Sequence, residues 1–142
     1  MINLDYLAGF IDADGNFSIR KPSENNTSFG FSVSVGSIDL AVLKEIQESF
    51  GGEIYNTKAR ETNFGKGKEF WQLKWGGNKA IALANLLVSR LRIKKKQAEI
   101  FTTIQIYHTG SSFLSANKVE ARLAAYWAIR NLNGAVLSEE VS

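Results

Sequence analysis

One nine-residue stretch, residues 7–15, constrains this chain more than any other part of its sequence. It reads LAGFIDADG, and Leu7, Phe10 and Ile11 recur in it at helical spacing. Apolar residues at positions i, i+3 and i+4 are typical of a helix that buries one stripe of its surface. We therefore predict a motif helix over about 4–14.

The two ends of this helix differ in chemistry. Asn3 is a favourable N-cap, and Gly15 is expected to end the helix because glycine tolerates a positive φ. Asp12 and Asp14 fall at the C-terminal end, where the helix dipole disfavours negative charge. A carboxylate in that place raises the local energy unless a cation joins it, so the pattern indicates a metal site.

Composition narrows the class of protein. The chain has 142 residues, with 44% hydrophobic and 22% charged residues, which predicts one globular domain over 1–142. It has no cysteine and one histidine, which excludes disulfides and argues against a zinc site. With no membrane-length apolar run and no signal-peptide pattern, we expect an intracellular protein that has no membrane partner.

Basic side chains gather in two regions, although the formal net charge is only +3. Such clusters favour a polyanionic partner, and a simple solvated surface is the alternative. One cluster is compact and contains no acidic residue: Arg90, Arg92, Lys94, Lys95 and Lys96. The other is more dispersed: Lys58, Arg60, Lys66, Lys68 and Lys74.

The order of expected elements predicts an α+β domain. Alternating apolar and polar residues indicate strands over 16–21, 29–36, 53–55 and 69–75. Helical patterns cover 40–50, 78–88, 97–107 and 116–132, so the C-terminal helices occupy about 95–132. In the last helix Val119, Leu123 and Trp127 recur every fourth residue and are expected to face inward. This order gives an antiparallel sheet with helices on one face.

The polar faces of the expected strands resemble a reading surface for DNA, because a β-ribbon fits the major groove, where each base pair has its own donor and acceptor pattern. With the nearby basic residues, the candidate DNA contacts are Asn16, Ser18, Arg20, Ser32, Ser34, Tyr55, Thr57, Lys58, Arg60, Lys66, Lys68, Phe70, Gln72, Lys74, Lys95 and Lys96.

Residues 7–15 differ from the signature of the LAGLIDADG homing endonucleases only at Phe10, and the chain resembles that family. The resemblance implies an αββαββα fold with a four-stranded saddle-shaped antiparallel sheet. It also implies a site-specific, metal-dependent DNA endonuclease of a mobile intron, which makes a double-strand break with 3′ overhangs at a long, roughly palindromic target. Double-stranded DNA is then the partner, and no small-molecule cofactor is expected.

The same resemblance assigns catalysis to the acid at the eighth motif position, Asp14, with the peptide oxygen of Ala13 as a second metal ligand. Mg²⁺ or Mn²⁺ is the expected ion, and Ca²⁺ is expected to bind without supporting cleavage. Hard-oxygen ligands and a single carboxylate suit Mg²⁺, which keeps several waters. Asp12 is expected to be mainly structural.

Two further residues are candidates for the catalytic pocket. The segment 91–98 resembles one found in dimeric, chloroplast-type members, in which the first lysine reaches the pocket; this implies Lys94, and contact with the DNA backbone is the alternative. Members of the family usually carry a glutamine near the end of the second strand, where this chain has Val35, Gly36 and Ser37. Ser37 is the candidate to fill that role.

One motif per chain implies a homodimer, since a duplex has two strands to cut. The expected seam comprises the motif residues Ala8, Gly9, Asp12 and Ala13. The alternative function is a non-cleaving nucleic-acid binder on the same fold, such as an intron RNA-splicing maturase or a regulator. The expected place of action is an organelle, either a chloroplast or a mitochondrion, or a bacterial or archaeal cytoplasm.

Overall fold

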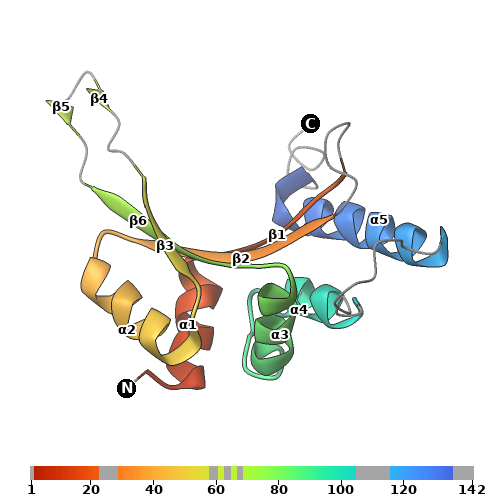
Figure 1. Ribbon diagram of the computed structural model, residues 1–142, viewed down its shortest axis with the longest axis horizontal. Coiled ribbons are helices and arrows are strands. Elements are labelled where there is room, and N and C mark those ends of the chain that lie inside the picture. The colour runs from red at the N-terminus through yellow and green to blue at the C-terminus, as the bar shows by residue number, and fades with distance from the viewer. Residues whose placement is uncertain are drawn as a thin grey trace.

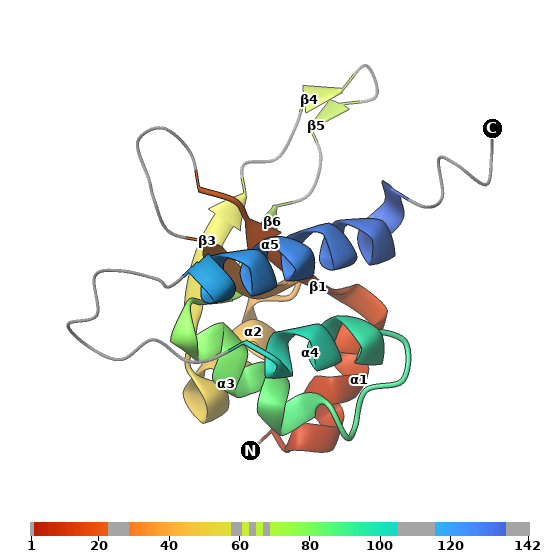
Figure 2. The same cartoon turned by 90° about the vertical axis from the view of Figure 1, so that its right-hand side faces the viewer.

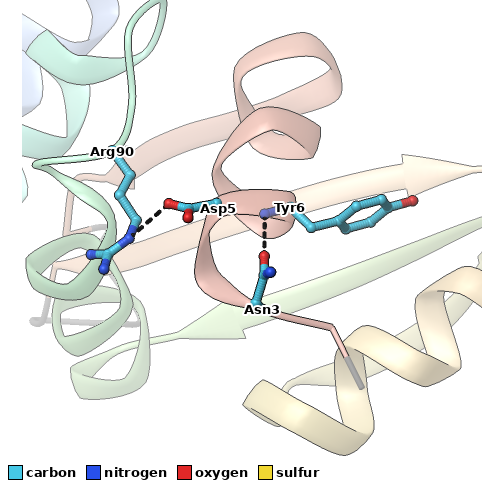
Figure 3. A network of polar contacts seen from close by, with 4 residues as sticks. All are labelled: Asn3, Asp5, Tyr6 and Arg90. Carbon is cyan, nitrogen blue, oxygen red and sulfur yellow. Dashed lines mark hydrogen bonds and ion pairs between the residues drawn. The ribbon is translucent and has the colours of Figure 1, made fainter.

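Helix α1 (Leu4–Asp14) starts at the predicted cap in a computed structural model that describes residues 2–22, 29–57, 61–62, 65–66, 69–104 and 116–135. The Asn3 side chain accepts a hydrogen bond from the backbone N–H of Tyr6 at 2.8 Å (Figure 3). Leu7 and Ile11 are fully buried, while Phe10 is partly buried and packs against the core. The predicted helix and its buried stripe are thus confirmed.

Gly15 ends α1 for a different reason from the one expected. Its φ is −83°, an extended value that any residue adopts. A Cβ at this position would lie 2.6 Å from the carbonyl oxygen of Ile11 and 2.8 Å from its Cα. Glycine is therefore required by space, because the chain turns directly from the helix into a strand against the backbone of the preceding turn.

Four strands form one antiparallel sheet in the order β1-β2-β6-β3 (Figure 1). Their bounds are β1 (Gly15–Arg20), β2 (Gly30–Ser37), β6 (Phe70–Gly76) and β3 (Glu53–Thr57). A separate short antiparallel pair, β4 (Glu61–Thr62) and β5 (Gly65–Lys66), lies between β3 and β6 in the sequence. The predicted antiparallel four-stranded sheet is confirmed.

One face of this sheet is the floor of the hydrophobic core, and the helices cover that face (Figures 1 and 2). Phe17, Phe31, Val33, Leu73 and Trp75 point into it and are almost fully buried. The covering helices after α1 are α2 (Leu40–Phe50), α3 (Asn78–Leu87), α4 (Lys95–Thr102) and α5 (Ala116–Arg130), which continues into the π-turn η1 (Asn131–Ala135). The α+β class with helices on one face is confirmed.

Two expectations about the C-terminal helices are wrong. Helix α4 ends at Thr102 rather than continuing to 107, with Thr103 as its C-cap; residues 105–107 lie outside the described part of the chain. In α5 the side chains of Val119, Leu123 and Trp127 are exposed instead of buried.

The buried side of α5 consists of Arg122, Ala125 and Ile129. The guanidinium carbon of Arg122 lies 5.5 Å from the centre of the Phe31 ring, an arrangement that compensates part of the cost of burying its charge. A basic residue therefore faces the core on α5, whereas the spacing of apolar residues predicts that Val119, Leu123 and Trp127 do so. No helix among the described residues has the length and apolar character to cross a membrane.

Candidate active site

The polar face of the sheet is ordered in rows by the strand register. Asn16 pairs with Ser34, Ser34 with Lys74, and Lys74 with Glu53, so these four residues form one row across four strands. In the neighbouring row Gly36 pairs with Gln72, and Gln72 pairs with Tyr55. Since Gly15 pairs with Val35, the preceding Asp14 comes next to Gly36 at the β1 end of that second row.

A hollow of about 430 Å³ opens at this place on the polar face. It brings together residues from α1, β1, β2 and β6 that are far apart in the sequence. Its lining residues are Asp14, Asn16, Ser34, Gly36, Ser37, Ile38, Phe70 and Gln72. Because its walls are mainly carboxylate, amide and hydroxyl groups, the hollow suits a polar or charged ligand, and we call it the Asp14 hollow.

Asp14 is exposed to solvent at the C-terminal end of α1. Its carboxylate makes no hydrogen bond or ion pair with any residue in the described ranges. The predicted metal ligand is thus available to an outside group.

Asp12, two residues earlier, is fully engaged. Its Oδ1 accepts hydrogen bonds from the backbone N–H groups of Ile93 and Lys94 at 3.0 Å, and its Oδ2 accepts one from Arg92 at 2.9 Å. These contacts hold the segment before α4 against the end of α1. Asp12 is therefore a positioning residue within one chain, and it fixes the backbone of Lys94 next to the helix end that carries Asp14.

The segment between α3 and α4 is also held at its other end. Arg90 Nε donates to Asp5 Oδ1 at 3.0 Å (Figure 3). Both side chains are largely exposed, so this ion pair contributes little stability. The compact basic cluster is therefore not one uniform surface, since Arg90 pairs with Asp5 whereas Lys95 and Lys96 are exposed on α4.

Ser37, the candidate for the role of the glutamine that members of the family usually carry, lines the Asp14 hollow together with its neighbour Gly36. The Ser37 hydroxyl accepts a hydrogen bond from the N–H of Asp39 at 2.9 Å, which supports the start of α2. The ring of Phe70 lies directly over Gly36. A Cβ built on Gly36 would lie only 2.3 Å from Phe70 Cζ, so a larger residue does not fit there with the ring in this place. Two amides line this hollow, those of Asn16 and of Gln72 on the neighbouring strand. Sequence reasoning missed that Gln72 shares a hollow with Asp14, because this placement depends on the β2–β6 register.

The remaining candidate contacts fall into two groups. Ser18 and Ser32 share a hydrogen bond of 2.6 Å on the polar face, and Arg20, Thr57 and Lys74 are exposed on the same sheet. Lys58, Arg60 and Lys68 lie outside the described residues, and for Lys66 only the backbone of β5 is described.

The exposed side of α1 differs from the expected seam. Ala8 is buried in the core of its own chain, with 2% of its surface exposed, so it does not belong to an outward face. Gly9 and Ala13 are exposed, and a Cβ built on Gly9 meets nothing within 4 Å. The outward side of the helix adds Tyr6 and Phe10, whose ring centres lie 6.2 Å apart.

Comparison with known proteins shows which family and which solved structures this arrangement resembles. The family model described as LAGLIDADG endonuclease matches residues 7–70, which include most of α1, the strands β1, β2 and β3, and every lining residue of the Asp14 hollow except Gln72. This match supports the LAGLIDADG homing endonuclease family for residues 7–70 of the chain. In the matched segment, α1 carries the motif, and Asp14 is the acid at its eighth position.

A curated relative is the probable intron-encoded endonuclease 3 of Neurospora crassa, which is 30% identical over 84 residues. The match covers 55% of this chain, and the chain spans only 12% of the length of that relative.

Solved homing endonucleases share the fold. An archaeal intron-encoded homing endonuclease complexed with DNA is 20% identical, with a TM-score of 0.68 over 91% of this chain and 82% of its own. I-SmaMI bound to uncleaved DNA with calcium is 17% identical, with a TM-score of 0.70 over 92% of this chain and 46% of its own. One copy of this fold therefore fills less than half of the I-SmaMI chain.

Proposed function

We propose that two copies of this chain together cut both strands of a specific DNA duplex when a divalent metal ion is present. The observation that carries the proposal is the exposed Asp14 carboxylate at the end of the motif helix, in a hollow on the polar face of the sheet. The Neurospora relative is an intron-encoded endonuclease, which supports intron homing as the context and an organelle or a microbial cytoplasm as the place of action.

The polar face supports DNA recognition. It presents amide, hydroxyl and cationic side chains from four strands, and none of the helices in the described part of the chain covers it (Figure 1). An eight-residue strand spans roughly 26 Å, enough to follow a good part of a helical turn of DNA in the major groove. The archaeal relative in fold and I-SmaMI are both described with bound DNA, which agrees with this use of the face.

The donor set at Asp14 fits a hard divalent cation. Among the described residues there is no cluster of three or more histidine, cysteine or acidic side chains, so a soft or fully protein-coordinated metal does not fit. Asp14 and the Ala13 carbonyl would hold Mg²⁺ or Mn²⁺ together with waters and phosphate oxygens. When bound, such an ion offsets charge on the phosphate and lowers the pKa of a bound water.

The other residues contribute positioning and charge. Gln72 and Ser37 line the Asp14 hollow, where an amide and a hydroxyl can hydrogen-bond a water next to the scissile phosphate. Lys94, whose backbone is fixed by Asp12, would place a positive charge beside the phosphate and stabilise charge that develops during cleavage. Asp12 itself acts only through the segment that it holds.

A second copy would supply the second acid. The residues on the exposed side of α1 around Gly9 and Ala13 are small enough to let another helix approach closely. Two such helices about a two-fold axis would bring two Asp14 hollows together over one duplex, one for each strand. A two-fold protein then recognises a roughly palindromic sequence.

The test begins with a random-sequence duplex library. Sequences retained by the wild-type protein in Ca²⁺ are amplified and then incubated with the protein and Mg²⁺ or Mn²⁺. We expect cleavage of both strands with 3′ overhangs, read by mapping the new ends. Asp14→Asn should bind the same duplex and lose at least a hundredfold in cleavage rate, because the carboxylate that would hold the metal is gone.

Asp5→Asn is the matched control, because it removes an exposed carboxylate from the same helix on the side of Arg90. It should cleave like the wild type. Equal cleavage by Asp14→Asn would remove Asp14 from the mechanism. Retention of DNA or RNA without cleavage in any metal would instead support the non-cleaving binder on the same fold.

A further inference from the structure

A second hollow opens on the polar face of the sheet, at the end of β3 and β6 that lies away from Asp14. Its volume is about 300 Å³, and its lining residues are Gly52, Glu53, Tyr55, Lys74, Gly76, Asn78 and Lys79. Tyr55 stands in the same row as Asp14 but three inter-strand spacings from it, roughly 14 Å. The two hollows have no lining residue in common, although Tyr55 pairs with Gln72, which lines the Asp14 hollow.

Glu53 and Tyr55 act as a pair in this hollow. They are two residues apart on β3 and so point to the same side of the sheet. The Tyr55 hydroxyl donates a hydrogen bond to Glu53 Oε2 at 2.5 Å, and about half of the Tyr55 side chain remains exposed. An ionised carboxylate only accepts hydrogen bonds, so the single phenolic hydrogen is used up within the pair.

What the pair offers to a ligand is therefore a set of acceptors. The phenolic oxygen keeps its lone pairs, and the carboxylate keeps further acceptor positions. The hydrogen bond to Glu53, followed by the negative charge of Glu53, raises the pKa of Tyr55 above the usual 10.0, so the phenol stays protonated and the pattern holds at neutral pH.

The position of Glu53 is unusual for a DNA-facing surface. It is the only acidic residue in the four strands of the sheet. A carboxylate that faces the DNA phosphates weakens binding unless it accepts a hydrogen bond from a donor on the DNA. Lys74 lies directly opposite Glu53 in the register and Lys79 lines the same hollow, so two cations can meet the phosphates while the carboxylate turns to a base.

We infer that Glu53 and Tyr55 select a base that presents an exocyclic amino group in the major groove, N4 of cytosine or N6 of adenine. Guanine and thymine present acceptors at the corresponding edge, which the pair would repel. This inference rests on the proposed function and adds the base class that one part of the surface recognises.

The experiment is selection from a random duplex library in Ca²⁺, followed by sequencing of the retained pool. The wild type should retain cytosine or adenine at one position in each half-site. Glu53→Gln supplies an amide that also donates, so the preference there should fall about tenfold while other positions stay unchanged. Tyr55→Phe keeps the ring and removes the hydroxyl, and should lower the same preference by a smaller factor.

Two controls separate base reading from other effects. Glu48→Gln makes the same chemical change on an exposed position of α2, behind the sheet, and should leave the selected sequence unchanged. Lys79→Gln removes a cation from the hollow and should weaken all sequences alike, with a smaller salt dependence.

Identical selected sequences for the wild type, Glu53→Gln and Tyr55→Phe would overturn the inference, as would guanine or thymine at the position that these variants affect. A wild-type protein that retains no duplex at all would overturn both this inference and the proposed function. Selective retention without cleavage in Mg²⁺ would contradict only the proposed nuclease, because the reading by Glu53 and Tyr55 would still be measured.

Discussion

At the scale of single residues, two acids on one helix have opposite environments. Asp12 accepts three backbone hydrogen bonds, from Arg92, Ile93 and Lys94, whereas the carboxylate of Asp14 has no partner among the described residues. Their positions differ by two residues, or about 200° around the helix. One side chain therefore reaches a neighbouring segment of the chain, and the other faces the polar side of the sheet.

The Tyr55–Glu53 pair gives a pH-dependent prediction. Since Glu53 raises the pKa of Tyr55 above 10.0, the hydrogen bond stabilises the folded chain below pH 10 and its contribution is lost as the pH rises through the raised value. Glu53→Gln removes the charge and should bring the pKa closer to 10.0. The measurement is the tyrosinate absorbance during a base titration, taken as the difference between each protein and its Tyr55→Phe counterpart.

Glu48→Gln serves as the control for this titration, because it removes an exposed charge on α2 and should leave the Tyr55 curve unchanged. A titration of Tyr55 that is the same with and without the Glu53 carboxylate would contradict the pairing.

At the scale of elements, the connection between α3 and α4 determines where Lys94 lies. Asp5 holds Arg90 near the start of α1, and Asp12 holds residues 92–94 near its end. Lys94 is also the N-cap residue of α4, but its side chain makes no capping hydrogen bond. Asp12 accepts from the N–H groups of Arg92, Ile93 and Lys94, directly before the first residue of α4, and so holds the entry to this helix from another helix.

Replacing Asp12 should therefore detach this connection. Asp12→Ala leaves three backbone N–H groups without their acceptor, and we expect the free energy of unfolding to fall by about 2 kcal/mol. Cleavage should fall as well, because Lys94 is no longer held beside the helix end. Denaturant unfolding followed by circular dichroism measures the first effect, and the cleavage assay measures the second.

Asp5→Ala is the matched variant for the other end of the same connection. Its ion pair is exposed, so the loss should stay below about 1 kcal/mol. If Asp12→Ala were as stable as the wild type, the three hydrogen bonds would not hold the segment.

The last helix shows how packing overrides a simple pattern. Trp127 is exposed, yet its ring lies 5.6 Å from Lys21 Nζ and 5.8 Å from the guanidinium carbon of Arg130. Cations over its faces make an exposed tryptophan less costly. The spacing of apolar residues alone cannot show that this cover exists.

At the scale of the whole molecule, the proposed dimer depends on the outward side of α1. Within one chain a Cβ at Gly9 meets nothing within 4 Å, and alanine is a better helix former than glycine. Gly9→Ala should therefore stabilise the isolated chain by about 0.5–1 kcal/mol. In a close helix–helix seam the same methyl group should push two copies apart.

Gly9→Ala should therefore raise the stability of the isolated chain and weaken the association of two copies. Sedimentation of Gly9→Ala should show weaker self-association than the wild type, while its unfolding at concentrations where the wild type is monomeric shows a gain in stability. Ala82→Ser, on an exposed position of α3, is a control that should change neither association nor cleavage. Stronger or equal association of Gly9→Ala would place the seam elsewhere.

Sequence patterns alone are sufficient to predict the motif helix, its Asn3 cap, the α+β class and the alternation that separates the buried and polar faces of the strands. These features follow from local periodicity and from residues close together in the chain, which a pattern contains. Gly51 and Gly52 at the end of α2 have positive φ values, another feature that depends only on residues close together in the chain.

Contacts between segments that are far apart in the sequence follow from the tertiary structure and not from any local pattern. Gln72 shares a hollow with Asp14 because of the β2–β6 register, Asp12 caps a segment about eighty residues away, and Ala8 turns into the core while Gly9 turns out. Arg122 faces the core on α5, where its guanidinium group lies over the Phe31 ring. Each of these outcomes depends on strand register or on packing between distant segments, and such contacts leave no periodic trace in the sequence.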